Sequence, residues 1–339
     1  MTAIGAFITG CAGPVLTPRE TAFLIRANPW GLILFRRNCE TPEQLKALTS
    51  AFRAAVGRRD APVLIDQEGG RVQRLGPPSN AWRKFPPARA YGELYAIDAL
   101  KSLRSARNVG RLMAEGLIAA GITVNCVPVL DVPQPGSHDI IGNRAYSMNR
   151  EQIMALARAH VAGFMDGGVL PVMKHIPGHG RAKADSHLDL PVVDASKAEL
   201  AEHDFPPFAA FADAPMAMTA HVVYTSLDKS APATLSAKVI RKVIREQIGF
   251  NGLLMTDDLS MKALSGTYAE KTERALKAGC DIVLHCNGEL DQMEEVAAAA
   301  GVLKGKSLRR ARAALKMARK PQPFDRKMAL KDLDALVSG

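Results

Sequence analysis

Residues 252–258 read Gly252-Leu253-Leu254-Met255-Thr256-Asp257-Asp258, an apolar run that ends in two carboxylates. A short run that is apolar on both faces is typical of a buried strand in a parallel sheet. Side chains alternate in direction along a strand, so one of the two aspartates must point into the protein at the carboxyl end. We expect that residue to be Asp257, and we expect Asp258 to anchor the next loop or to cap a helix.

Similar runs recur along the chain and alternate with longer helical patterns. We predict eight strands, over residues 6–11, 31–35, 62–66, 123–130, 170–175, 216–223, 252–257 and 281–286. We predict helices between them, over residues 41–56, 91–120, 150–166, 197–211, 237–247 and 269–278. Eight strands that alternate with helices predict an α/β fold, the TIM (β/α)8 barrel. An open, doubly wound sheet is the alternative that the periodicity leaves open.

Polar residues follow the ends of six of the predicted strands. They are Asp66, Asp131, Lys174, His175, His221, Asp257, Asp258, His285 and Asn287. In a barrel the carboxyl ends of the strands meet at one mouth, which is where such folds place catalysis. Ionisable groups at a packed end must be solvated or paired, so the pattern predicts a shared polar cleft.

The composition is that of a globular protein with a large core. Of the 339 residues, 47% are hydrophobic and 23% are charged, which excludes a disordered chain. The net charge is +10, but residues 301–339 hold 11 Lys or Arg against three Asp, so the tail carries +8 and the rest only +2. A nearly neutral body argues against a nucleic-acid partner. We expect one barrel domain over residues 1–339, whose basic helical tail packs on the body through its apolar stripe, Leu308, Ala311, Leu315 and Ala318.

The cysteines and the N-terminus indicate a reducing compartment. The five cysteines are odd in number and include no C-x-x-C pair, and most lie in apolar runs: Cys11, Cys39, Cys126, Cys280 and Cys286. Residues 3–16 are apolar, but no Lys or Arg precedes Arg19, so an export signal is not expected. No run reaches the roughly 20 apolar residues that a membrane span needs. We expect a cytoplasmic protein without stable membrane association.

A histidine-rich loop follows the predicted strand over residues 170–175. It reads Lys174-His175-Ile176-Pro177-Gly178-His179-Gly180 and continues to Asp185-Ser186-His187. Asp185 is two residues from His187, so its carboxylate can orient the imidazole and favour its charged form, which makes His187 a candidate general acid/base. The alternative is an ordinary surface turn with a solvated histidine. The histidines lack the H-E-x-x-H spacing of a zinc site, so we expect no metal.

A second polar segment follows the strand over residues 62–66. It reads Ile65-Asp66-Gln67-Glu68-Gly69-Gly70-Arg71-Val72-Gln73-Arg74. Carboxylates, amides and guanidiniums in such a loop offer many directional hydrogen bonds, as sugar hydroxyls require. A salt-bridged loop would explain most of the same residues, and only Asp66 stands at the strand end.

Together these segments resemble glycoside hydrolase family 3, specifically its β-N-acetylglucosaminidases. The resemblance rests on K-H-I-P-G-H-G, D-S-H, I-D-Q-E-G-G-R-V-Q-R, V-P-V-L-D-V and L-M-T-D-D-L-S-M, and it runs in order from about residue 10 to about residue 287. It implies a TIM-barrel exo-hydrolase that acts with retention of configuration, without a cofactor or a metal. The substrate it implies is a peptidoglycan fragment in which N-acetylglucosamine is linked to 1,6-anhydro-N-acetylmuramic acid, with or without peptide. We expect such an enzyme to act as a monomer.

The resemblance also implies roles for individual residues. Asp257 matches the nucleophile, His187 the acid/base and Asp185 its partner. The positions that hold the terminal sugar match Asp66, Arg74, Arg144, Lys174 and His175. The chain departs from the common pattern around Arg144, where it reads Gly-Asn-Arg-Ala-Tyr, and at Ile176, where Phe is frequent. Larger members carry a second α/β domain with a carboxylic acid catalyst, and the loop histidine is expected to serve here instead.

Three other functions use the same residues. A phosphorylase would replace water by phosphate, because a histidine repels phosphate less than a carboxylate does. A metal-dependent hydrolase would use the loop histidines as ligands. A sugar-binding barrel without catalysis is disfavoured, because both the nucleophile and the acid/base are present.

Overall fold

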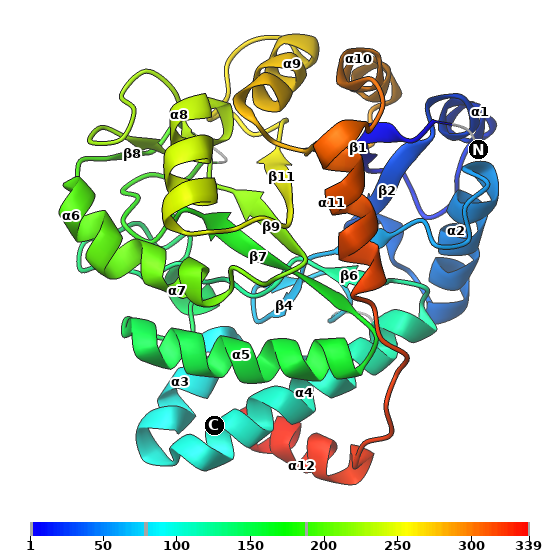
Figure 1. The fold of residues 1–339 in the computed structure, drawn as a ribbon. Helices are drawn as coiled ribbons and strands as arrows, with labels where there is room; N and C mark the ends of the chain where they lie inside the picture. The colour runs from blue at the N-terminus through cyan, green and yellow to red at the C-terminus, as the bar shows by residue number, and fades with distance from the viewer. Residues whose placement is uncertain (1–2, 78–80, 187–188, 338–339) are drawn as a thin grey trace.

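The computed structural model of the chain describes residues 3–77, 81–186 and 189–337. Eight parallel strands form a closed barrel at the centre of the molecule, and helices surround it (Figure 1). The strands are β1 (Gly5–Thr9), β2 (Pro29–Leu34), β3 (Val63–Ile65), β6 (Val124–Asn125), β7 (Leu170–Ile176), β9 (Met216–Thr219), β11 (Leu253–Asp258) and β12 (Ile282–His285). The predicted TIM barrel is therefore confirmed.

Pairing between the first and last strands closes the barrel. β1 pairs with β12 in the register Phe7 to Val283, and β1 pairs on its other side with β2. An open doubly wound sheet has two free edges, so this pairing excludes that alternative. The strands are buried on both faces, as their apolar sequences predict; all seven residues of β7 and all six of β2 are buried.

All eight predicted strands are present, although their ends differ. The largest difference is in residues 123–130, where only Val124–Asn125 is a regular strand. Pro128 has no N–H to donate to a ladder, and beyond it only an isolated bridge joins Val129 to Lys174. Two small sheets were not predicted. One is the antiparallel pair β4 (Gln67–Gly69) and β5 (Val72–Gln73), and the other is the parallel pair β8 (Val192–Val193) and β10 (Val223–Tyr224).

The helices of the outer layer largely follow the prediction. They are α1 (Pro18–Ala27), α2 (Pro42–Ala55), α3 (Ala88–Ile97), α4 (Ala99–Ala119), α5 (Arg150–Asp166), α6 (Lys197–Glu199), α7 (Phe205–Ala210), α8 (Ala237–Val239), α9 (Tyr268–Ala278), α10 (Leu290–Ala300), α11 (Gly305–Lys316) and α12 (Arg326–Val337). Two π-helical segments, η3 (Leu200–Asp204) and η5 (Ile240–Gln247), continue α6 and α8. Short 3-10 turns occur at η1 (Arg36–Asn38), η2 (Gly142–Arg144) and η4 (Ala233–Leu235).

The single helix predicted over residues 91–120 is wrong, because the structure divides it at Asp98. The backbone of Asp98 is extended, and its side chain accepts a hydrogen bond of 2.9 Å from the N–H of Lys101. It therefore caps the start of α4. Helix α1 was not predicted, although its sequence carries a capping box in which Thr17 and Glu20 bond to each other's backbone.

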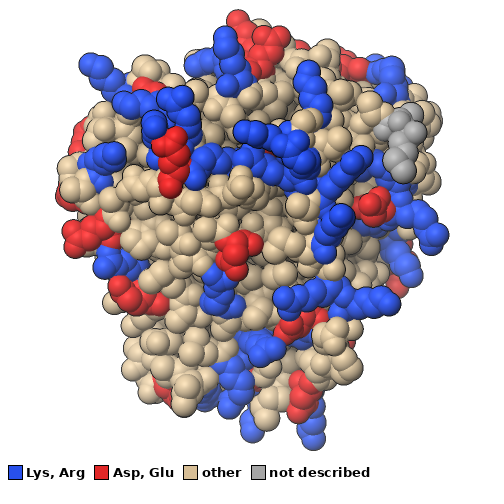
Figure 2. All heavy atoms as spheres, in the orientation of Figure 1, with Lys and Arg blue, Asp and Glu red and all other residues tan. Residues whose placement is uncertain are grey.

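The basic tail contains two helices that lie on the body. In α11, Ala311 is buried and Leu308 and Leu315 pack against the core, as expected. Ala314 fills the fourth position of the stripe, because the helix ends at Lys316 and leaves Ala318 exposed. Figure 2 shows Lys and Arg side chains gathered over the middle of the face on which α11 lies in Figure 1. Across the described residues, no helix combines the length and the apolar character needed to cross a membrane.

Candidate active site

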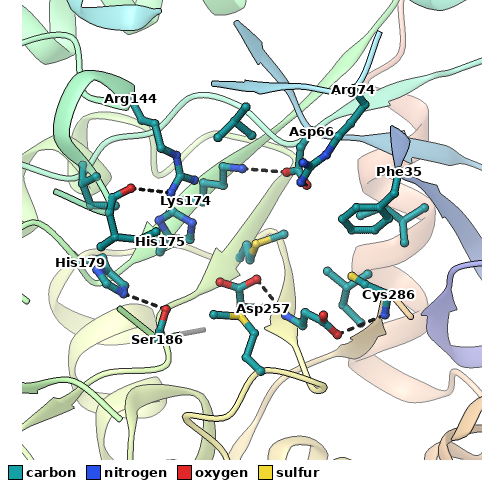
Figure 3. A pocket seen from close by; sticks show the side chains of 18 of the residues that line it. Phe35, Asp66, Arg74, Arg144, Lys174, His175, His179, Ser186, Asp257 and Cys286 are labelled. Atoms are coloured by element: carbon teal, nitrogen blue, oxygen red, sulfur yellow. Dashed lines mark hydrogen bonds and ion pairs between the residues drawn. The ribbon is translucent and has the colours of Figure 1, made fainter. Parts of the chain in front are cut away.

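A cavity of about 360 Å³ lies at the carboxyl ends of the barrel strands. Side chains that follow β2, β3, β7, β11 and β12 all reach it, so the predicted shared cleft is present (Figure 3). Of the residues predicted for the site, those that line it are Asp66, Arg74, Arg144, Lys174, His175, Asp257 and Asp258. The other strand-end residues, Asp131, His221, His285 and Asn287, are not part of its lining.

One wall of the cavity is a network of buried and half-buried charges. Lys174 Nζ lies 2.8 Å from Asp66 Oδ1 and 2.6 Å from Glu68 Oε1. Arg144 binds Glu68 through two hydrogen bonds, of 2.8 and 2.9 Å. Arg74 reaches the other oxygen of Asp66 at 3.1 Å. The wall thus contains three cations and two carboxylates, and its donors and acceptors are held in fixed directions.

The electrostatics of this wall keep Asp66, Glu68 and Lys174 ionised. Burial by itself would raise the pKa of Asp66, but the charges of Lys174 and Arg74 outweigh it and hold that pKa well below its usual range. Burial likewise opposes ionisation of Glu68, but Arg144 and Lys174 lower its pKa to about 2. The two carboxylates in turn raise the pKa of Lys174, against the effect of its burial.

Glu68 is the member of the wall that the sequence analysis did not assign to the site. It lies in β4, after the strand end at Asp66, and a tight turn at Gly69 and Gly70 folds the chain back into β5. Gly69 has a φ of 100°, and a Cβ there would lie 2.1 Å from the carbonyl oxygen of Pro86. The only sequence signal was a carboxylate beside a Gly-Gly turn, which a surface loop would also show.

Asp257 extends into the cavity from the end of β11, as predicted (Figure 3). Its Oδ1 accepts a hydrogen bond of 2.8 Å from the N–H of Asp258, and no hydrogen bond from the described residues reaches Oδ2. Burial would raise the pKa of Asp257, but the nearby His175 and His221 lower it below its ordinary value. Asp257 is therefore an ionised carboxylate with one oxygen available to a ligand.

Asp258 also reaches the cavity lining, but its carboxylate is engaged in the surrounding loops. It accepts hydrogen bonds from the N–H of Ser260 at 3.0 Å, from the Ser260 hydroxyl, and from the N–H of Cys286 at 3.1 Å. These contacts join the loop after β11 to the end of β12. The expectation that Asp258 anchors a loop is confirmed.

Asp131 and His221 do not line the cavity, but each hydrogen-bonds to a residue that does. Asp131 is fully buried, and its Oδ2 lies 2.7 Å from His175 Nδ1, which fixes the orientation of that ring. His221 bonds to Thr234 Oγ1 at 2.7 Å and to the carbonyl oxygen of Asp258 at 3.0 Å. Burial lowers the pKa of His221, and both of its ring nitrogens are hydrogen-bonded beside the nucleophile candidate.

The predicted Asp185–His187 pair is only partly described. Asp185 is half-buried in the loop after β7 and is followed by Ser186, which lines the cavity. His187 lies outside the described residues, so its role and its distance from Asp185 remain predictions. Within the described ranges, no group of three or more His, Cys, Asp or Glu side chains is arranged to hold a metal ion.

Comparison with known proteins identifies the family. The model for the glycosyl hydrolase family 3 N-terminal domain matches residues 18–319. A β-hexosaminidase of Chromobacterium violaceum is 40% identical over 287 residues, which cover 84% of this chain and 79% of that protein. A β-hexosaminidase of Alkalilimnicola ehrlichii is 39% identical over 290 residues, which cover 84% of this chain and 81% of that protein.

Solved structures show the same relationship. The crystal structure of NagZ from Neisseria gonorrhoeae in complex with N-trifluoroacetyl-D-glucosamine superposes with a TM-score of 0.89 and 33% identity, over 99% of both chains. A family 3 β-N-acetylglucosaminidase from Paenibacillus has a TM-score of 0.79 and 29% identity, over 98% of this chain and 62% of that one. Sequence and fold agree, and the chain belongs to glycosyl hydrolase family 3.

Proposed function

We propose that the protein is an exo-β-N-acetylglucosaminidase that hydrolyses its substrate with retention of configuration. The observation that carries the proposal is the carboxylate of Asp257, which is ionised and faces a wall of charged hydrogen-bonding groups across a small cavity. Among the described residues, none donates a hydrogen bond to its Oδ2. A carboxylate in this position can attack an anomeric carbon while the wall holds the hydroxyls of the sugar. The β-hexosaminidase names of the relatives support the choice of an amino sugar.

The proposed reaction has two steps. Asp257 forms a bond to the anomeric carbon as the glycosidic bond breaks, and His187 gives a proton to the leaving oxygen. In the second step neutral His187 takes a proton from water, the water oxygen bonds to the anomeric carbon, and Asp257 leaves. Two displacements at one carbon retain the configuration. A neutral base also avoids a second negative charge beside Asp257, which would raise the pKa of the nucleophile.

Asp66, Arg74, Arg144, Lys174 and His175 are proposed to bind the terminal sugar. Asp66 and Lys174 face the cavity side by side, and they offer an acceptor and a donor to adjacent hydroxyls. Arg144 is more than 90% buried and is engaged with Glu68, so it holds the wall in place as well as lining the cavity. The natural substrate we propose is the disaccharide of N-acetylglucosamine and 1,6-anhydro-N-acetylmuramic acid, with or without peptide, released during peptidoglycan recycling. We place this reaction in the cytoplasm, which the five unpaired cysteines support.

A fluorinated amino-sugar fluoride tests the nucleophile directly. It should form a stable ester on the peptide that contains Asp257, and mass spectrometry should find no label in Asp257→Ala. On 4-nitrophenyl N-acetyl-β-glucosaminide, the wild type should release a β-configured sugar by NMR. A label on another residue, or an α-configured first product, would contradict the proposed mechanism.

The same assay separates the alternative functions. With phosphate present, a hydrolase releases free N-acetylglucosamine, whereas a phosphorylase releases its 1-phosphate. Activity that survives EDTA excludes a metal-dependent hydrolase. Comparison of the anhydromuramic acid disaccharide with chitobiose tests the substrate, because the proposal requires a higher kcat/KM for the former.

A further inference from the structure

The loop after β7 begins on a rigid base. The N–H of His179 donates a hydrogen bond of 2.6 Å to Asp131 Oδ1, and the Tyr224 hydroxyl donates one of 2.6 Å to the carbonyl oxygen of Gly178. Gly180 lies against the backbone of Val132, and a Cβ there would be 2.1 Å from the Val132 carbonyl oxygen. These contacts tie the first residues of the loop to the barrel.

Farther along the loop, a side-chain contact joins Ser186 back to this base. Ser186 Oγ lies 3.2 Å from His179 Nε2, both side chains line the cavity, and each residue is only 3% exposed (Figure 3). Burial, together with the nearby His175, lowers the pKa of His179 to about 4, so its ring is neutral near pH 7. A neutral ring has one donor and one acceptor nitrogen, and a hydroxyl can bond to either.

Ser186 is also bonded to the chain that follows the nucleophile candidate. The N–H of Ala263 donates a hydrogen bond of 3.3 Å to the carbonyl oxygen of Ser186. Ala263 lies five residues after Asp258, which is itself tied to Ser260 and Cys286. Ser186 therefore contacts the base of its own loop on one side and the segment after β11 on the other.

We propose that Ser186 and His179 are positioning residues that set where the acid/base pair stands relative to Asp257. Ser186 stands between Asp185 and His187 in the sequence, and its two contacts hold the last described residue of the loop before His187. The inference rests on the proposed function, because it assigns to the pair the proton transfer described there. A displacement of about 1 Å at a proton-transfer group is enough to slow a reaction by about 100-fold.

The leaving group of the substrate separates this role from a merely structural one. A 2,4-dinitrophenolate leaves without a proton, whereas the phenolate of an unsubstituted phenyl glycoside needs one as it departs. We expect Ser186→Ala to lower kcat/KM on phenyl N-acetyl-β-glucosaminide by roughly 10- to 100-fold. On the 2,4-dinitrophenyl substrate, where glycosylation of Asp257 needs no acid, kcat/KM should fall less than about threefold.

A second pair of variants tests the partner. His179→Leu removes the group that bonds to Ser186 and should reproduce the selective loss. His179→Gln places an amide near the position of Nε2 and should restore most of the kcat/KM on the phenyl substrate. Ser102→Ala is the matched control, since Ser102 is also buried and donates a hydrogen bond of 2.6 Å to Tyr91, but it lies on α4 away from the cavity. It should leave the dependence on the leaving group unchanged.

The outcomes separate this proposal from the proposed function. Equal losses of Ser186→Ala on both substrates, or no loss on either, overturn the positioning role. If His187→Ala shows the selective loss and Ser186→Ala does not, the acid/base assignment stands and the positioning role is wrong. A wild-type protein that hydrolyses neither substrate overturns both. Thermal unfolding of each variant identifies any loss of activity that comes from a damaged fold. If Ser186→Ala is damaged in this way, the comparison of His179→Gln with His179→Leu tests the positioning role instead.

Discussion

Lys174 and Glu68 form an ion pair of 2.6 Å in which each side chain is less than 5% exposed. The two residues are far apart in the sequence. Lys174 lies in the barrel strand β7, and Glu68 lies in the small β4–β5 hairpin that follows β3. The pair is one link in the chain of charges Arg74, Asp66, Lys174, Glu68 and Arg144. The most buried of these charges, Lys174, Glu68 and Arg144, are stable in the interior because they are paired with one another.

Removing the charge of Glu68 is therefore expected to destabilise the whole protein. Glu68→Gln leaves Arg144 and Lys174 with one carboxylate too few, and we expect the free energy of unfolding to fall by about 3–5 kcal/mol. Denaturation in urea measures the change. The control is Asp139→Asn, because Asp139 pairs with Arg71 at the surface and should cost less than about 1 kcal/mol. An equal decrease in the free energy of unfolding for the two variants would show that the buried wall does not need the charge of Glu68.

Asp66 is expected to matter for affinity rather than for folding. It is more accessible than Glu68, and Lys174 keeps Glu68 as a partner when Asp66 is lost. Asp66→Asn should weaken the binding of N-acetylglucosamine by roughly 10- to 100-fold, because a charged acceptor becomes a neutral one. Isothermal titration measures the affinity. Unchanged affinity would place the sugar elsewhere in the cavity.

His160 is expected to make stability depend on pH. It is 2% exposed, its Nδ1 bonds to the Tyr146 hydroxyl at 2.8 Å, and burial lowers its pKa from 6.5 to about 3. Below pH 6.5 the unfolded chain binds a proton that the folded chain does not bind. The free energy of unfolding should therefore decrease as the pH falls from about 6.5 to about 3.

His160→Asn isolates this contribution, because its amide can keep the bond to Tyr146 and does not titrate. Between pH 7 and pH 4, the wild type should lose roughly 3 kcal/mol more stability than the variant. Denaturant unfolding at the two pH values measures the difference. Equal losses of stability in the wild type and the variant would mean that His160 is protonated in the folded protein or that other groups dominate the pH dependence.

The end of the basic tail is expected to contribute to stability through one aspartate. Asp332 on α12 is 4% exposed and accepts hydrogen bonds from Asn108 at 2.7 Å and Arg104 at 3.3 Å, both on α4. Asp332→Ala should lower the free energy of unfolding by about 1–3 kcal/mol, because it leaves both donors without their acceptor. Asp334→Ala, two residues away on the exposed side of α12, should have almost no effect. Similar effects of the two changes would contradict the docking of α12.

Much of the fold could be predicted because the signals are local. Eight apolar runs and the helical patterns between them are properties of short segments, and all eight strands formed where expected. The errors also have local causes. Asp98 caps a new helix within a long helical pattern, and Thr17 with Glu20 starts a helix just after the apolar run over residues 3–16. Strand length was less predictable, since Pro128 ends the regular ladder near Asn125.

The sequence by itself determined that the barrel's polar groups stand at strand ends, that Asp257 lies near the end of β11, and to which family the chain is similar. Tertiary structure decided which of those groups share a cavity. It brought Glu68 to Arg144 and Lys174. It placed Asp131 and His221 outside the cavity lining, where they hydrogen-bond to neighbouring residues. It also joined Ser186 to His179 and Ala263. The physical reason is that the polarity of a strand depends only on its own residues. The partner of a buried charge depends instead on closure of the barrel between β1 and β12, which brings distant segments together.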